Sequence, residues 1–250
     1  MTSLAANEFS ESHRVVDHEV DDTRRLTLAQ LINLFVLVSE DQNDNLGLGV
    51  DFVQSHGVGW VVTQYHFQVT RMPLAGDTVV VKTKATAFNK YFAYREYWLF
   101  AADGTTLAYG ESIWVAMSYA TRKIATIPME IIAPYETAPV KRLPRLPRPS
   151  RFDETQTTET KPYLVRYFDI DANGHVNNAH YFDWMLDALP AEFLRTHQLR
   201  DFQIRFENEV RYGEAVASVA SHTATTSQHR IMMGATTAAT ANAAWAMRER

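Results

Sequence analysis

The spacing of apolar residues predicts two similar halves, each with a helix followed by strands. In the first half, apolar residues recur every three or four positions from residue 28 to residue 38, which is typical of a helix with one buried face. Thr27 and Gln30 form the capping pattern expected at its N-terminus. Turn-forming residues at 43–49 then end the helix.

Segments rich in Val, Thr, Tyr, Phe and Trp follow, and they predict strands at 60–69, 78–87, 92–100 and 106–119. Gly76-Asp77 and Asp103-Gly104 mark turns between them. Before the helix we expect a loose N-terminus through residue 12 and a short strand at 13–20. A helix followed by antiparallel strands indicates an α+β layer, with the helix covering one face of a sheet.

The second half repeats this order. Residues 163–170 predict a strand, and Asn177 or Asn178 can cap the helix that follows. Pro190 ends that helix, and further strands are expected at 203–212, 215–223 and 229–237. A shift of 150 positions places Asp21 on Asp171 and Leu26 on Val176. The pattern therefore indicates an internal duplication.

A basic, proline-rich segment separates the halves. Residues 141–151 hold three prolines and five basic residues, which predicts an extended linker. We expect an N-terminal domain at 1–140, a linker at 141–158 and a C-terminal domain at 159–250. The linker is either a solvated strap or a site that attracts an acidic partner.

Composition narrows the possible functions. The 250 residues carry a formal net charge of −5, which counts against binding to nucleic acid. The absence of cysteine excludes disulfides, cysteine nucleophiles and thiolate metal sites. We find neither a signal peptide nor an apolar run of about 18 residues that could span a membrane, and we expect a cytoplasmic protein. Gly47 and Gly49 do not complete a dinucleotide-binding loop, so no cofactor is expected.

Three polar residues alternate just before the second helix, namely Asp171, Asn173 and His175. In a locally extended chain they would point to one side, and Gly174 permits a backbone bend between them. An acceptor, an amide and an imidazole together form a candidate catalytic set. The alternative is that they only cap the helix, although the asparagines at 177 and 178 already supply capping groups.

The first half lacks this set, because Thr23 and Arg25 stand at the positions of Asn173 and His175. We therefore expect chemistry in the second half alone. A metal site is not expected, because His175 and His180 lie about 140° apart around a helix. Glu209 is the other candidate. It is expected on the polar face of the strand at 203–212, either as a catalytic carboxylate or within a salt-bridge ladder.

These residues resemble a known family. The run from residue 169 to residue 187, Asp-Ile-Asp-Ala-Asn-Gly-His-Val-Asn-Asn-Ala-His-Tyr-Phe-Asp-Trp-Met-Leu-Asp, resembles the signature of the acyl carrier protein (ACP) thioesterases of the FatA/FatB type. Gly59-Trp60-Val61-Val62, Ser112-Ile113-Trp114-Val115 and Thr121-Arg122-Lys123 resemble the N-terminal domain of that family. The resemblance implies an α+β tandem hotdog fold, in which each half is a long central helix wrapped by an antiparallel sheet.

The resemblance also implies hydrolysis of fatty acyl-ACP thioesters in fatty acid biosynthesis. The family's catalytic residues fall on Asp171, Asn173, His175 and Glu209. Val210 stands where plant members carry a cysteine, which favours attack by water. Asp171 is expected to orient the amide and the imidazole. The N-terminal half is expected to hold the acyl chain, and the linker or Arg122 and Lys123 to dock the acidic ACP.

Three other functions remain open on sequence alone. A thioesterase acting on acyl-CoA would use the same water chemistry but need a nucleotide site. A non-catalytic hotdog protein could bind acyl chains without hydrolysis, and a dehydratase of this fold would eliminate water from a hydroxyacyl substrate. Chain-length preference and oligomeric state, a homodimer included, also stay open.

Overall fold

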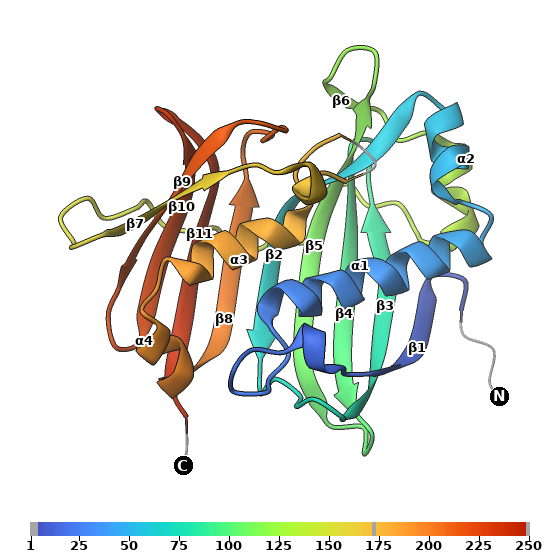
Figure 1. The fold of residues 1–250 in the computed structure, drawn as a ribbon. Helices are drawn as coiled ribbons and strands as arrows, with labels where there is room; N and C mark the ends of the chain where they lie inside the picture. Colours follow the sequence, from blue (N-terminus) through green and yellow to red (C-terminus); the bar gives the residue numbers. More distant parts are fainter. Residues whose placement is uncertain (1–4, 172–173, 249–250) are drawn as a thin grey trace.

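A single curved antiparallel sheet forms the body of the molecule (Figure 1). The computed structural model describes residues 5–171 and 174–248. Each named strand pair is antiparallel, and the strand order is β1-β3-β4-β5-β2-β8-β11-β10-β9-β7, with the short β6 paired to β5. Thus β2 and β8 meet at the centre, and the order outward from them is the same in both halves.

The first half contains one long helix. Its helices and strands are β1 Glu8–Arg14, η1 Asp17–Glu19, α1 Leu28–Asn45, α2 Val50–Ser55, β2 Val58–Val69, β3 Thr78–Phe88, β4 Phe92–Ala101, β5 Thr106–Ser118, β6 Ile124–Ala125, η2 Met129–Ile131 and η3 Ala133–Tyr135. The side chain of Thr27 caps α1 by accepting from the backbone N–H of Gln30 at 3.2 Å, as predicted. The N-terminal prediction was wrong, because the first strand begins at Glu8 and pairs with β3.

The second half has the same order with a shorter helix. It contains β7 Glu159–Leu164, η4 Tyr167–Asp169, α3 Asn178–Asp187, α4 Ala191–Thr196, β8 His197–Phe206, β9 Ala215–His222, β10 Thr226–Met233 and β11 Thr236–Met247. Asn177 caps α3, with its side-chain oxygen accepting from the N–H of Ala179 at 3.0 Å. In the described residues, no helix is both long enough and apolar enough to cross a membrane.

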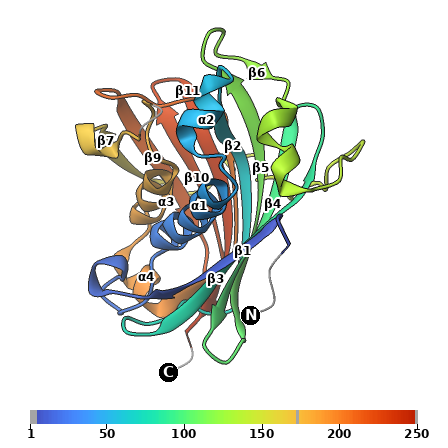
Figure 2. The same ribbon diagram turned by 90° about the vertical axis from the view of Figure 1, so that its right-hand side faces the viewer.

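The helices α1 and α3 lie end to end across one face of the sheet, which curves around them (Figures 1 and 2). The core lies between these helices and the strands. Phe35 of α1 stacks on Tyr97 of β4 with ring centroids 4.8 Å apart, and Phe67 packs beside it. Gly110 allows this close packing, because a Cβ there would lie 2.9 Å from both phenylalanine rings. The helix therefore rests directly on the backbone of β5.

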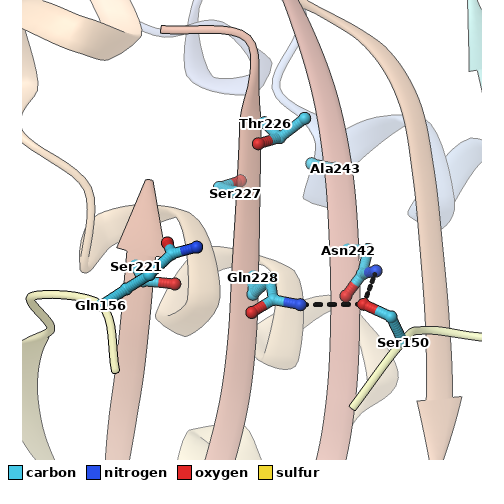
Figure 3. Close-up of a pocket in the computed structure, with 8 residues that line it drawn as sticks. All are labelled: Ser150, Gln156, Ser221, Thr226, Ser227, Gln228, Asn242 and Ala243. Atoms are coloured by element: carbon cyan, nitrogen blue, oxygen red, sulfur yellow. Dashed lines mark hydrogen bonds between the residues drawn. The ribbon is translucent and has the colours of Figure 1, made fainter. Parts of the chain in front are cut away.

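The linker lies on the opposite face of the sheet from α1 and α3 (Figure 2). Leu146 is buried against Tyr94, and the Pro147 carbonyl accepts from Gln64 Nε2 at 2.5 Å. Further along, Ser150 Oγ lies 2.8 Å from the side-chain amides of Gln228 and Asn242 (Figure 3). A polar cavity of about 230 Å³ remains between this part of the linker and β9–β11. The linker is therefore a strap attached along the sheet.

A charged network joins the two halves on the same outer face. His66 of β2 bonds through Nδ1 to Glu111 of β5 at 3.0 Å and through Nε2 to Asp201 of β8 at 2.7 Å. Burial alone would lower the pKa of His66, but hydrogen bonds to the two carboxylates outweigh burial and raise this pKa to about 9. The imidazolium is therefore a bridging cation at neutral pH.

This bridge predicts a loss of stability at alkaline pH. Because the folded-state pKa is raised, the stabilisation is complete below the unfolded value of about 6.5 and is lost as pH rises through about 9. Its magnitude should be roughly 2 kcal/mol after allowance for solvent screening. Urea unfolding should show that wild type has a larger free energy of unfolding than His66→Gln at pH 7, and this difference should shrink by pH 10. The exposed His18→Gln variant is the control, and a difference independent of pH would contradict the assignment.

Candidate active site

The loop before α3 is built around a buried carboxylate. Asp169 is 2% exposed, and it accepts from the backbone N–H of Arg166 at 2.8 Å and from Arg166 Nη2 at 2.6 Å. Its own carbonyl accepts from the N–H of Asn177 at 2.9 Å, which closes the loop onto the start of α3. These bonds fix both ends of the segment that carries the predicted catalytic set.

Inside this loop the chain forms a tight turn. The N–H of Asp171 donates to the His175 carbonyl at 2.8 Å, and the N–H of Gly174 donates to the Asp171 carbonyl at 3.0 Å. Gly174 adopts φ 80°, as its position predicted. These hydrogen bonds bring Asp171 and His175 together across a turn, whereas the alternation considered from the sequence applies only to a locally extended chain. Asn173 lies outside the described residues.

The first half repeats the main backbone hydrogen bonds of this loop 150 residues earlier. Glu19 takes the place of Asp169 and accepts from the N–H of Val16 at 2.9 Å. The N–H of Asp21 donates to the Arg25 carbonyl at 2.9 Å, and Arg24 adopts φ 61° where the second half has Gly174. The sequence shift thus corresponds to a structural repeat in which Arg25 occupies the position of His175.

Glu209 reaches His175 from a loop rather than from a strand. The strand β8 ends at Phe206, because the N–H groups of Glu207 and Asn208 both donate to the Ala238 carbonyl, so the predicted strand through residue 212 was wrong. The N–H of Val176 donates to the Val210 carbonyl at 3.1 Å and holds this loop beside the turn. As a result, Glu209 Oε2 lies 3.3 Å from His175 Nε2. Asp171 is also in contact, since its Oδ1 accepts from the N–H of His175 at 3.3 Å.

Arg122 is a site residue that sequence reasoning missed. It projects from the turn between β5 and β6, and its Nη2 donates to Glu209 Oε2 at 2.5 Å and also to His175 Nε2. From the sequence, either the linker or Arg122 and Lys123 are expected to dock ACP. The only signal for a site role was its place in the Thr121-Arg122-Lys123 motif, which does not reveal a partner 87 residues away.

The surrounding charges keep Glu209 ionised. Burial raises the pKa of Glu209, but the hydrogen bond from Arg122 and the positive charges of Arg122 and Arg211 outweigh burial and hold this pKa below its ordinary value. Arg211 Nη2 lies 3.6 Å from the same carboxylate oxygen. At neutral pH the carboxylate can therefore accept a proton.

A small pocket of about 10 Å³, close to the size that one water requires, opens beside His175. It is lined by Gly59, Trp60, Val61, Met117, Tyr119, Arg122 and His175. Its apolar wall and the side chains of Tyr119 and Arg122 come from the first half, and His175 comes from the second. Among the described residues, no cluster of three or more His, Asp or Glu side chains is arranged to hold a metal ion.

Two family models match the chain in tandem. The acyl-ACP thioesterase N-terminal domain matches residues 6–135, and the acyl-ACP thioesterase C-terminal domain matches residues 152–247. The chain belongs to the acyl-ACP thioesterase family. This membership confirms the family resemblance that the motifs at 59–62, 112–115, 121–123 and 169–187 indicated.

Solved structures confirm the double-hotdog fold of this acyl-ACP thioesterase family member. A Lactobacillus plantarum protein assigned as an oleoyl thioesterase is 51% identical, and the match covers 97% of each chain with a TM-score of 0.93. The 12:0-ACP thioesterase from Umbellularia californica is 22% identical, and that match covers 98% of this chain and 100% of the other with a TM-score of 0.85.

A chloroplastic acyl-ACP hydrolase of Cuphea viscosissima is 29% identical over 225 residues, which cover 84% of this chain and 54% of the relative. The chain thus spans about half the length of the curated relatives it matches.

The duplicated loops predict matched losses of stability in this acyl-ACP thioesterase family member. Asp169→Ala and Glu19→Ala should each lower the free energy of unfolding by about 1–3 kcal/mol, because each leaves a backbone donor without its acceptor. Urea unfolding at pH 7 measures both. Asp17→Ala, which removes an exposed carboxylate from the same turn as Glu19, should be within about 0.5 kcal/mol of wild type. Equal stability of Asp169→Ala and wild type would contradict this account.

Proposed function

We propose that this protein hydrolyses the thioester between a fatty acyl chain and ACP and releases a free fatty acid. The observation that carries the proposal is the contact between His175 and Glu209, 3.3 Å apart, beside a small pocket where the two halves meet. Membership of the acyl-ACP thioesterase family supplies the substrate class. The absence of cysteine makes water the proposed nucleophile.

In the proposed mechanism, Glu209 acts as general base. The carboxylate accepts a proton from water while the water oxygen attacks the thioester carbonyl carbon, and His175 orients that water. From the family resemblance, Asn173 is assigned the role of holding the water or the developing oxyanion. Collapse of the tetrahedral intermediate breaks the C–S bond, and the departing thiolate takes the proton. Asp171 supports His175 through the backbone contact described above.

The acyl chain is proposed to enter the first half beside Trp60. This side chain lines the pocket and also packs against an apolar cluster separate from the main core, which includes Leu48, Val53 and Ile131. The helix residues expected from sequence to form the wall, Leu31, Phe35 and Val38, are fully buried in the main core. They are not among the residues that line the small pocket beside His175.

Substitution of the base tests the mechanism. Glu209→Gln should lower kcat for acyl-ACP hydrolysis by ~10²–10⁴-fold, because the amide cannot accept the proton. Asn173→Ala should lower kcat by ~10²–10³-fold. Free fatty acid release from acyl-ACP measures both, with Glu207→Gln as the control on the same loop. Near-normal turnover in Glu209→Gln would falsify the assignment. Comparing kcat/KM on acyl-ACP and acyl-CoA distinguishes the two carriers.

An exposed aromatic patch beside the site is proposed to dock ACP. It consists of Leu164, Tyr167, Phe168 and Tyr212, whose exposed fractions are 66%, 73%, 87% and 66%. The N–H of Val165 donates to the Glu214 carbonyl at 3.0 Å, which keeps the two segments of the patch side by side. Arg166 and Arg211 flank it with positive charge, which suits an acidic carrier.

Removal of the aromatic side chains tests this surface. The double variant Tyr167→Ser, Phe168→Ser should raise KM for acyl-ACP about tenfold with little change in kcat, because contact area is lost without change at Glu209. KM for a small synthetic thioester should not change. Leu74→Ser serves as the control. Leu74 lies in the β2–β3 connection, and its apolar side chain is less exposed than those of the patch. An unchanged KM for acyl-ACP in the double variant excludes the patch.

A further inference from the structure

We propose that Arg122 of the N-terminal half is a positioning residue for the C-terminal site, where it holds the Glu209 carboxylate and the His175 imidazole in one fixed arrangement. This inference rests on the proposed catalytic roles of Glu209 and His175. It assigns to the first half a direct polar contribution to the site, in addition to the pocket wall.

The hydrogen bonds of Arg122 determine the tautomer of His175. A guanidinium can only donate, so His175 Nε2 must act as the acceptor and cannot carry a proton. The proton of the neutral imidazole is then on Nδ1. Because the same Nη2 also donates to Glu209 Oε2, a single group presents an unprotonated nitrogen and an ionised carboxylate side by side. Arg122 occupies the one lone pair of His175 Nε2, whereas the carboxylate of Glu209 keeps further lone pairs and can still accept a proton from water.

The backbone of Arg122 aims its side chain at the site. Arg122 adopts φ 55°, a left-handed conformation that is uncommon for a residue with a Cβ. The turn is closed on both sides, since the N–H of Arg122 donates to the Ser118 carbonyl at 2.9 Å and the N–H of Ser118 donates to the Lys123 carbonyl at 2.9 Å. Strained residues of this kind cluster at functional sites, where the surrounding structure maintains them.

Other charges near Glu209 do not replace Arg122. The titratable groups facing the carboxylate are Arg122 from the β5–β6 turn, His175 and Tyr181 from the α3 region, and Arg211 from its own loop. Arg211 is more distant, at 3.6 Å, and its side chain is 63% exposed, so water screens it. Without Arg122, burial would act on Glu209 with less opposition and raise its pKa.

The pH dependence of hydrolysis tests the role. In Arg122→Gln, the acid limb of the kcat/KM profile should move to higher pH. At the acid end kcat/KM should fall about tenfold relative to wild type, and the difference should shrink towards alkaline pH. Arg122→Lys should recover part of the loss, because it restores the charge without the planar fork. The matched control is Arg24→Gln, at an exposed arginine that also adopts a left-handed conformation, with φ 61°. An acid limb that coincides with wild type in Arg122→Gln overturns the proposal.

A second measurement does not depend on activity. The ¹⁵N NMR signals of His175, assigned by their loss in His175→Gln, should report an unprotonated Nε2 in wild type and change in Arg122→Gln but not in Arg24→Gln. If wild type hydrolyses no thioester and the His175 signals still respond to Arg122→Gln, the proposed function fails while the positioning role stands. If hydrolysis is normal and neither the acid limb nor the His175 signals respond, the positioning role fails.

Discussion

The structure depends on the pairing of β2 with β8. Five residue pairs, from Gln64 with Arg205 to Gln68 with Asp201, join the two halves into one sheet. This pairing places β5, the neighbour of β2, close to the loop that follows β8. Arg122 follows β5 and Glu209 follows β8, so their contact is a consequence of how the halves are joined. Neither half alone contains Arg122, His175 and Glu209 together.

The repeated loops show how a duplicated scaffold can diverge in chemistry. The hydrogen bonds that shape the loop are backbone bonds and one buried carboxylate, so they survive replacement of the exposed side chains. Where the second half has His175, the first has Arg25, whose guanidinium cannot act as a base. The loop frame is therefore structural in both halves, and the chemistry depends on a few side chains placed on it.

Sequence patterns predicted the parts of this fold that depend on local interactions. Thr27 and Asn177 cap α1 and α3 because their side chains bond to backbone nitrogens two or three residues ahead, and the left-handed turn at Gly174 needs only glycine. The position of Glu209 could not be predicted, because the alternation of apolar residues continues past Phe206 while pairing with Ala238 ends the strand. The contacts of Arg122 with Glu209 and of His66 with Asp201 join residues 87 and 135 positions apart. Such contacts depend on strand order, which no local pattern encodes.

The strand order sets a lower limit on the length of the linker that connects the two halves. The first half finishes near β3, where the Val140 N–H bonds to Phe88, whereas the second half begins with β7 at the far edge of the sheet. At about 4.8 Å between strands, the distance from β3 to β7 is roughly 38 Å, which requires about twelve extended residues. Two hotdog units could therefore not have been fused through a tight turn. The mirrored strand order requires a long connector. Because this connector crosses the sheet, its residues pack against the outer face.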